Sequence, residues 1–263
     1  MTKVLNDSEE PDGAPALESG PLGASEVHIW QAEVDPCRAF APQFESTLSQ
    51  DERARAARFH FARDQMAFVC ARGLVRLLLA SYLGSEPAAL SFTYNQRGKP
   101  ELGGSGLHFN LSHSHGVLLF AFARARRVGI DVELIQPERA LAEIVARHFS
   151  ECECMEWHRL PTSERTKAFF SAWTQKEAYL KATGDGLGVP LSSFSTSIRP
   201  QEPACLHGAL GEKWSLHSFS PRPGYAAAVA VEGKNFLVRS RAWRAPSDAF
   251  FPAGDPISPH VLN

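Results

Sequence analysis

Two short segments place carboxylates where apolar side chains are expected, and they constrain the fold more than any other feature of the chain. In residues 128–134, apolar residues alternate with Gly129, Asp131 and Glu133. This period of two predicts a strand with Asp131 and Glu133 on one face. Residues two apart on a strand are separated by about 6.5 Å. Two flexible carboxylates at that spacing can converge on one hard cation.

The second segment predicts a helix with a carboxylate in its apolar stripe. Glu177 lies between Trp173 and Leu180 at helical spacing, so it should face the core. A bare carboxylate is costly to bury there. Lys176 and Lys181 lie within a turn of it. Three carboxylates with lysines beside them indicate Mg²⁺ and a phosphate-bearing ligand.

Ordinary structural roles offer an alternative for the same residues. Asp131 and Glu133 could be the solvated face of an edge strand. Glu177 and Lys181 could be a helical i,i+4 pair worth about 0.3 kcal/mol. The functional interpretation is favoured because the charges are embedded in elements whose other positions look buried.

The two segments resemble the signature motifs of 4′-phosphopantetheinyl transferases, specifically the large, surfactin-synthetase-activating (Sfp-type) class. Two further motifs appear in the family's order: Gly98-Lys99-Pro100 precedes Phe109-Asn110-Leu111-Ser112-His113-Ser114, which is similar to the family's (F/W)N(I/L)SHS segment. Upstream, Arg58-Phe59, Asp64 and residues 72–76 resemble its amino-terminal helix. The resemblance covers about residues 45–230, and four ordered motifs make it specific.

The elements expected from periodicity give an α+β chain. A strand is expected near Val27, a capping box opens a helix at Ser49, and a helical stripe follows over 71–82. The segments 107–111, 117–123 and 128–134 predict an antiparallel meander. The second half predicts helices over 138–148, 151–159 and 164–182, the last ending at Gly184, and strands over 193–198, 214–219, 225–231 and 236–239.

The resemblance adds the architecture: two similar α+β halves related by a pseudo-twofold axis, with the active site between them. No internal repeat is visible at the level of residues. We expect a disordered tail over 1–25, an N-terminal half over 26–130, a C-terminal half over 131–244 and a C-terminal tail over 245–263. Two halves in one chain imply a monomer.

The resemblance also implies the reaction. The 4′-phosphopantetheine arm of coenzyme A moves to a serine of an apo acyl, peptidyl or aryl carrier protein, and 3′,5′-adenosine bisphosphate is released. The partner supplies the nucleophile, so the enzyme needs positioning, charge neutralisation and a base. Asp131, Glu133 and Glu177 would hold Mg²⁺, with Mn²⁺ left open, while Lys181 would reach the pyrophosphate, with Lys176 close by in the binding site.

Other matches to the family are single residues. Glu153 matches the proposed general base, yet Ser150 to Glu153 also forms a capping box, so both roles stay open. His113, beside Ser112, matches the histidine that contacts the 3′-phosphate of coenzyme A. Lys99 matches the adenine and ribose edge of the site.

Two arginines in the first half have looser matches. Arg55 lies in the region that offers basic residues to the 3′-phosphate, although one expected basic position is Glu52. Arg72 could contact the nucleotide or brace the two halves.

The same residues are open to other functional interpretations. A zinc site at His148, Cys152, Cys154 and His158 is disfavoured because the two cysteines would lie about 200° apart on a helix. A serine hydrolase using Ser112 or Ser114 with His113 fails because neighbours on a strand point to opposite faces. A metal-dependent phosphohydrolase shares the carboxylates and stays as the alternative enzyme. A catalytically silent carrier-protein binding module is a third possibility.

Composition narrows the partners and the compartment. A net charge of −2 over 263 residues gives no general attraction to nucleic acid. The amino terminus is acidic rather than basic and apolar, as a signal peptide would be, and the apolar runs fall short of a membrane span. An odd number of scattered cysteines indicates free thiols, so we expect a soluble cytoplasmic protein. The cysteines are Cys37, Cys70, Cys152, Cys154 and Cys205.

Overall fold

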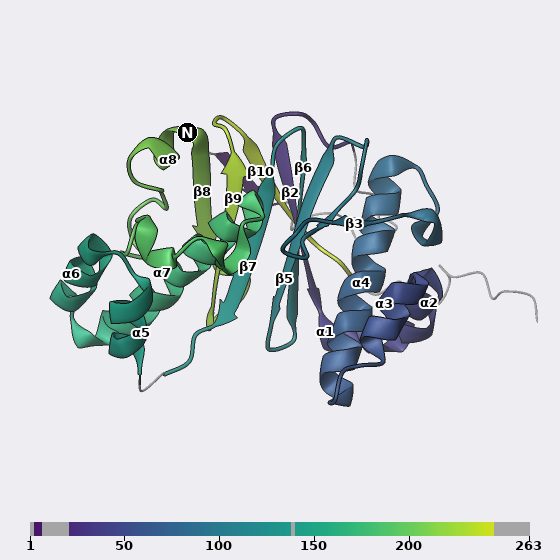
Figure 1. The fold of residues 1–263 in the computed structure, drawn as a ribbon, viewed down its shortest axis with the longest axis horizontal. Helices are drawn as coiled ribbons and strands as arrows, with labels where there is room; N and C mark the ends of the chain where they lie inside the picture. Colours follow the sequence, from purple (N-terminus) through teal and green to yellow (C-terminus); the bar gives the residue numbers. More distant parts are fainter. Residues whose placement is uncertain (1–2, 7–20, 138–139, 245–263) are drawn as a thin grey trace, which may run out of the picture.

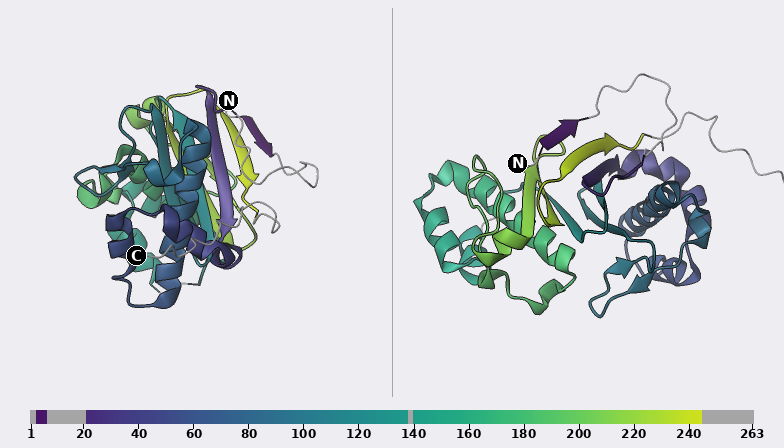
Figure 2. Two further views of the ribbon diagram at one scale, coloured as in Figure 1. Left: turned by 90° about the vertical axis from the view of Figure 1, so that its right-hand side faces the viewer. Right: turned by 90° about the horizontal axis from the view of Figure 1, so that it is seen from above.

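The strands of the protein lie between two groups of helices, as Figures 1 and 2 show. The computed structural model describes residues 3–6, 21–137 and 140–244. The elements of the first half are β1 (Lys3–Asn6), β2 (Glu26–Glu33), α1 (Val34–Cys37), α2 (Ala41–Thr47), α3 (Gln50–Ala56), α4 (Ala62–Leu83), β3 (Thr93–Tyr94), β4 (Pro100–Glu101), β5 (Leu107–Ser114) and β6 (Val117–Arg124).

The second half follows with β7 (Val128–Leu134), α5 (Leu141–His148), α6 (Glu151–Arg159), α7 (Thr162–Thr183), α8 (Ala209–Lys213), β8 (Trp214–Phe219), β9 (Tyr225–Glu232) and β10 (Leu237–Ala242). One sheet has the order β1-β10-β2-β6-β5, and a second has the order β7-β9-β8. Strand β10 is parallel to both of its neighbours, whereas the other pairs in these two sheets are antiparallel.

Strand β6 explains why the first sheet is covered on both faces. Its Leu118, Phe120 and Phe122 pack in a cluster with α4. Its Val117 and Leu119 pack in a second cluster with apolar residues of β7 and β9. The continuous apolar run is therefore a strand buried on both faces, and the two sheets pack against each other.

The two long helices repeat one design. Helices α4 and α7 each contain 22 residues and end at a glycine in the left-handed conformation, Gly84 (φ 62°) and Gly184 (φ 80°). Each is preceded by a short helix that opens with a complete capping box, at Ser49 and at Ser150. Helix α7 packs on β7 and β9 of the second sheet. The predicted fold of two similar α+β halves is confirmed.

Gly129 lets α7 lie against β7. A Cβ atom at this position would be 2.2 Å from the carbonyl oxygen of Ala178 and 2.3 Å from the backbone nitrogen of Ala182. Only glycine allows this approach. The face of β7 that carries Asp131 and Glu133 is thereby brought beside the helix that carries Glu177.

Several expectations about strands are corrected. Strand β7 pairs with β9 rather than with β6, so the three segments are not one meander. Residues 193–198 form no strand: a 3₁₀ turn covers Leu191–Ser193, and a single bridge joins Thr196 to Leu206. The predicted strand is wrong: beyond this bridge, Thr196 bonds to Glu153 and Ser197 bonds to residues 203–205, so no longer ladder forms.

The segment boundaries also differ from the expected ones. Strand β1 lies within the segment expected to be a tail, and β10 joins the first sheet. The boundary expected after residue 130 would cut β7, so the break between the halves belongs before Val128. The predicted C-terminal tail, 245–263, lies outside the described residues.

Within the described part of the chain, one helix is long and apolar enough to span a membrane, judged by length and composition alone. This helix is α4, whereas the sequence predicted that the apolar runs are too short to span a membrane. Most of it is buried, with Leu74, Val75 and Leu78 in the core, and it also buries Arg72 and Arg76. These are properties of the core helix of a folded domain.

Candidate active site

Strands β5 and β7 meet along a row of polar side chains. The side chain of Asn110 accepts a hydrogen bond from the backbone nitrogen of Ile130 (2.9 Å). Two residues on, Ser112 Oγ donates to Asp131 Oδ1 (3.0 Å). Two residues further, Ser114 Oγ donates to Glu133 Oε2 (3.0 Å). The spacing of two places all three side chains on one face of β5. Leu111 and His113, which lie between them in the sequence, point to the opposite face.

Lys181 completes this row from α7. Its Nζ lies 2.6 Å from Asp131 Oδ1 and 2.9 Å from Ser112 Oγ. The lysine side chain is 30% exposed, whereas that of Asp131 is 4% exposed. Asp131 Oδ2 is buried and has no hydrogen-bond partner. A buried carboxylate oxygen without a partner is costly, so it marks a place for a further donor or a cation.

Glu133 and Glu177 lie in the field of Asp131. Burial raises the pKa of both carboxyls above 4.5, and the charge of Asp131 raises each further. Repulsion among three carboxylates is relieved by a cation or by a proton. Among the described residues, no three histidine, cysteine or acidic side chains are already converged as a metal centre; Lys181 takes the Asp131 oxygen instead.

The donor set nevertheless fits Mg²⁺. The three side chains supply carboxylate oxygens, the ligands that this ion prefers, and they leave room for water and phosphate oxygens. The unpartnered Asp131 Oδ2 and the mutual repulsion are both relieved when a cation binds.

Lys176 does not belong to this site. It is fully buried, and its Nζ lies 2.8 Å from Glu153 Oε2 and donates to the carbonyl oxygens of Leu191 (2.8 Å) and Phe194 (2.6 Å). The expected place of Lys176 close to the pyrophosphate is corrected, because this side chain lies on the side of α7 that packs against the turn at 191–194.

Glu153 is equally buried. Its Oε2 accepts from the backbone nitrogen of Ser150 (2.8 Å), as a capping box requires, while Oε1 accepts from the backbone nitrogen of Thr196 (2.8 Å). The side chain is 2% exposed. The structure therefore shows the capping role of Glu153, and its role as general base stays a prediction.

The first half contains the same arrangement. Glu52 closes the capping box of α3 and pairs with Arg76 of α4 at 2.7 Å, both side chains being 1% exposed. Arg76 also donates to two carbonyl oxygens, those of Pro87 and Leu90. Arg76 and Lys176 stand at the same position in their helices. The buried pair is thus part of the repeated fold, whereas Glu177 corresponds to Leu77 and is specific to the second half.

The residues expected at the nucleotide end are more spread out. His113 is exposed on the other face of β5 from Ser112; desolvation and the nearby Lys181 lower its pKa. Lys99 donates to the carbonyl oxygens of Val128 and Ala182 and so ties the β3–β4 hairpin to the second half. Burial lowers the pKa of Lys99 to about 8.

Arg55 and Arg72 form a basic pair in the first half. Arg55 is exposed, with its guanidinium 5.4 Å from the ring centre of Phe68. Arg72 is buried, lies 3.6 Å from Glu52 and donates to Tyr94 Oη at 3.1 Å. Its Nη1 is buried without a hydrogen-bond partner. Arg72 therefore braces α4 to the hairpin and keeps one donor unused.

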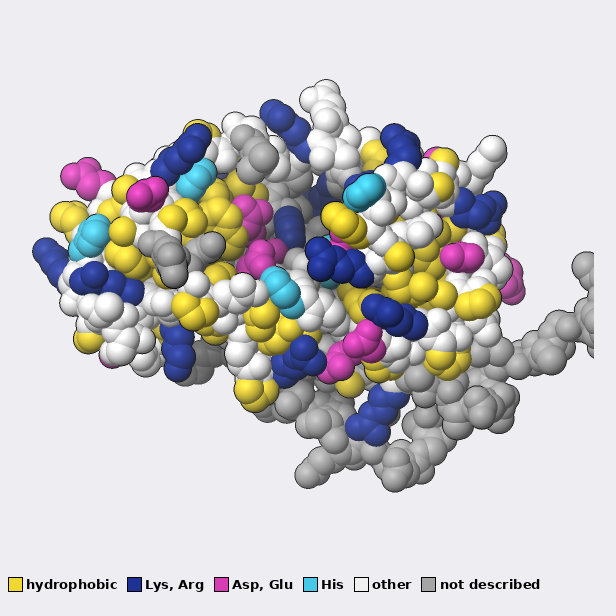
Figure 3. All heavy atoms as spheres, turned by 90° about the horizontal axis from the view of Figure 1, so that it is seen from below, with side chains coloured by type: hydrophobic (Ala, Val, Ile, Leu, Met, Phe, Trp, Pro, Cys, Tyr) yellow, Lys and Arg dark blue, Asp and Glu magenta, His cyan; other side chains and the backbone are white. Residues whose placement is uncertain are grey.

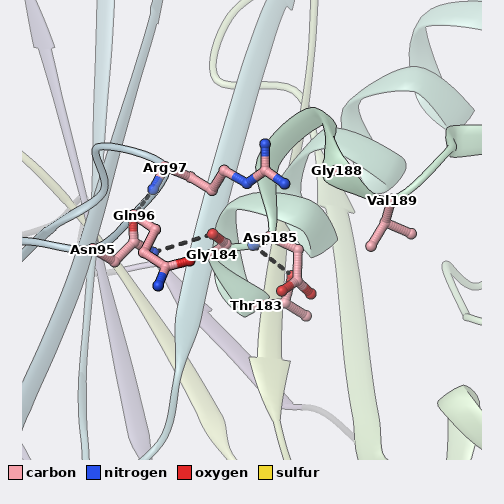
Figure 4. Close-up of a pocket in the computed structure, with 8 residues that line it drawn as sticks. All are labelled: Asn95, Gln96, Arg97, Thr183, Gly184, Asp185, Gly188 and Val189. Carbon is pink, nitrogen blue, oxygen red and sulfur yellow. Dashed lines mark hydrogen bonds between the residues drawn. The ribbon is translucent and has the colours of Figure 1, made fainter.

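A surface pocket of about 380 Å³ lies between this hairpin and the end of α7. Asn95 Nδ2 donates to the carbonyl oxygen of Gly184 (3.1 Å), and the side chain of Arg97 extends toward Gly188 (Figure 4). These residues were not predicted from the sequence, although they adjoin the Gly-Lys-Pro motif. From below, acidic, basic and histidine side chains gather near the line where the two groups of helices face each other (Figure 3).

Comparison with known proteins agrees with this division of the chain. Residues 127–230 match the model of the 4′-phosphopantetheinyl transferase superfamily, and residues 32–124 match that of the 4′-phosphopantetheinyl transferase N-terminal region. The chain is 42% identical over 216 residues to 4′-phosphopantetheinyl transferase HetI of Nostoc sp., covering 81% of this chain and 90% of that protein.

Two other matches are more distant. The chain is 28% identical over 198 residues to 4′-phosphopantetheinyl transferase Sfp of Bacillus subtilis, covering 74% of this chain and 86% of that protein. A solved holo-(acyl-carrier-protein) synthase from Bacillus anthracis in complex with CoA (3′,5′-ADP) is 25% identical, with a TM-score of 0.34, over 41% of this chain and 96% of that one.

Proposed function

Because this chain belongs to the 4′-phosphopantetheinyl transferase family and transfers the phosphopantetheine arm of coenzyme A to a carrier protein, we propose that the transfer takes place where β5, β7 and α7 meet. The main support for this location is that Lys181 contacts Asp131, whose second carboxylate oxygen is buried without a hydrogen-bond partner. Both groups suit a phosphate-bearing ligand, one as a cation and the other as a cation ligand.

Asp131, Glu133 and Glu177 are the residues that would hold Mg²⁺, or Mn²⁺ in its place. The ion would neutralise the charge that develops as the phosphoanhydride of coenzyme A breaks. Lys181 leaves the Asp131 oxygen and contacts the pyrophosphate directly. Its partial exposure supports this movement.

The adenosine end of coenzyme A is proposed to lie toward the hairpin. The pocket beside Asn95 and Arg97 offers a polar, open cavity there, and Lys99 fixes the hairpin against the second half. His113 and Arg55 are the groups proposed for the 3′-phosphate. A neutral histidine donates one hydrogen bond, and Arg55 supplies the charge.

The serine of the carrier protein attacks the β-phosphorus, and the phosphoanhydride bond to the leaving 3′,5′-adenosine bisphosphate breaks. The serine proton goes to one of the two half-buried carboxylates of the site, Glu133 or Glu177, because Glu153 is buried and fully engaged.

Broader features complete the proposal. The partners are apo acyl carrier proteins and peptidyl or aryl carrier domains, and the enzyme acts as a monomer because one chain supplies both halves. The described cysteines are all free thiols, which supports a cytoplasmic location. The net charge of −2 gives no reason to expect nucleic acid as a partner.

The test is intact-protein mass spectrometry of apo carrier proteins from fatty acid, polyketide and peptide synthesis, each incubated with the enzyme, coenzyme A and Mg²⁺. We expect a gain of one phosphopantetheine that Glu177→Ala and Asp131→Ala abolish. Glu212→Ala, at an exposed position of α8, is the matched control and should stay active. Full activity in either site variant would refute the metal assignment. No gain with any carrier, together with cleavage of coenzyme A, would support the phosphohydrolase alternative.

A further inference from the structure

The turn between β5 and β6 holds a histidine in a conformation that favours glycine. His115 has φ 43° and is followed by Gly116 with φ 86°. The turn is fixed from outside: Tyr225 Oη donates to the carbonyl oxygen of His115 (2.9 Å), and the backbone nitrogen of Val34 donates to that of Gly116 (2.9 Å). A strained non-glycine residue persists only when its surroundings fix it, and such residues gather at functional sites.

The ring of His115 lies in a chain of hydrogen bonds that ends on a carboxylate of the active site. Its Nε2 lies 2.9 Å from Nε2 of Gln136, and its Nδ1 lies 3.2 Å from Ser114 Oγ. Ser114 Oγ in turn donates to Glu133 Oε2 (3.0 Å).

The partners fix the direction of each bond. The amide nitrogen of Gln136 can only donate, so Nε2 of His115 accepts and the ring proton lies on Nδ1. Nδ1 then donates to Ser114 Oγ, whose own proton is free to go to Glu133. Ser114 Oγ also accepts from the backbone nitrogen of Leu134 (3.2 Å). The hydroxyl therefore has one donor direction left, and it is aimed at Glu133.

We propose that His115 is a positioning residue: through Ser114 it holds the Glu133 carboxylate in the orientation that binds the divalent cation. This inference rests on the proposed function, in which Glu133 is a metal ligand. Hydrogen bonds from outside the ligand set commonly orient a metal-binding side chain, and their loss weakens metal binding.

A purely structural role does not account for His115. The residue is exposed, so its ring buries little apolar surface, and glycine would adopt the observed backbone conformation without strain. What glycine cannot supply is the donor to Ser114. The bond to Ser114 would then be the reason for a histidine at this position, where the backbone conformation favours glycine.

The experiment titrates Mn²⁺ into the enzyme saturated with coenzyme A and follows the free ion by electron paramagnetic resonance, alongside thermal melting. His115→Gly should weaken Mn²⁺ binding by about tenfold while the melting temperature stays the same or rises. His115→Asn also suits the left-handed conformation and places an amide donor toward Ser114, so it should bind Mn²⁺ within about twofold of the wild type.

Ser114→Ala tests the residue that links His115 to Glu133. It should weaken Mn²⁺ binding as much as His115→Gly, and the double variant should be no weaker than either, because both remove one chain of bonds. Wild-type affinity in His115→Gly, or equal loss in the Gly and Asn variants, overturns the role of His115. Failure of the wild type itself to bind Mn²⁺ would instead reject the proposed metal site.

Discussion

The carboxylates of Glu52 and Glu153 have matching surroundings. Each closes a capping box, each pairs with a cation of a long helix, and each cation also donates to two carbonyl oxygens of a following turn. Because these contacts are shared, the two residues should respond alike to substitution. A catalytic role would break this equivalence, since only one half carries Glu177 and Lys181.

We therefore predict that Glu153→Gln and Glu52→Gln lower the free energy of unfolding by similar amounts, about 3 kcal/mol, because each leaves a buried cation without its partner. Turnover measured well below the melting temperature should change less than about fivefold in both. Urea unfolding and steady-state kinetics measure the two effects. A base at Glu153 would instead reveal itself as a large loss of turnover in Glu153→Gln alone.

Glu133 and Glu177 give the metal-free enzyme a pH-dependent stability. Their pKa values are raised in the folded state, so the folded protein holds these protons more tightly than the unfolded chain. Stability therefore falls as the pH rises above 4.5 through the folded-state pKa values. The fall should be smaller in Glu177→Gln, and Mg²⁺ should reduce it in the wild type. Urea titrations at pH 5 and 7 in the presence of a chelator test this; equal differences in both proteins would contradict it.

At the scale of elements, the contact between β7 and α7 positions the chemistry. Gly129→Ala would place a methyl group within 2.3 Å of two backbone atoms of α7, and backbone cannot rotate away as a side chain can. We predict a loss of about 3 kcal/mol in stability and a turnover loss larger than the unfolded fraction explains, because Asp131 and Glu177 move apart.

Gly103→Ala is the matched control for this change. No heavy atom lies within 4 Å of a Cβ at that position, so stability and turnover should stay close to wild type. Circular dichroism melts and carrier-loading rates distinguish the outcomes. A Gly129→Ala enzyme that loads carriers at the wild-type rate would show that the spacing of β7 and α7 is not critical.

Local patterns predicted the elements of the site but not their partners. The alternation in 128–134 and the helical spacing around Glu177 depend on neighbours in the sequence, so both were read correctly. The pairing of β7 with β9 joins residues far apart in the chain, and the opposite burial of Lys176 and Lys181 depends on which element covers each side of α7. Neither the strand pairing nor the difference in burial can be predicted from a short segment of the sequence.

The repeated buried pair was missed for a related reason. Arg76 and Lys176 differ in side chain, and the sequences around them are not similar. Comparison of the two amino-acid sequences therefore shows no repeat. The repeat is one of geometry: a capping-box glutamate, a cation on the long helix and a turn whose carbonyl oxygens complete the set. It becomes visible only when the contacts are known.

At the scale of the whole molecule, the two sheets share one apolar cluster that includes Val27 and Ile29 of the first sheet and Ile130 and Val229 of the second. The halves should therefore unfold together in one transition. The proposed ligand contacts both halves, through Arg55 and His113 on one side and Lys181 and Glu177 on the other. Binding should stabilise this single unit rather than one half of it.

We predict that coenzyme A with Mg²⁺ at about one hundred times the dissociation constant stabilises the fold by about 2.7 kcal/mol. For a chain of this size that corresponds to a rise of about 5–10 °C in melting temperature. Chelation of the metal should reduce the increase in melting temperature, because the pyrophosphate then meets three unneutralised carboxylates. Mg²⁺ without coenzyme A should have a smaller effect than the two together. Calorimetry tests the prediction: two transitions, only one of which moves with coenzyme A, would mean that the ligand is held by one half alone.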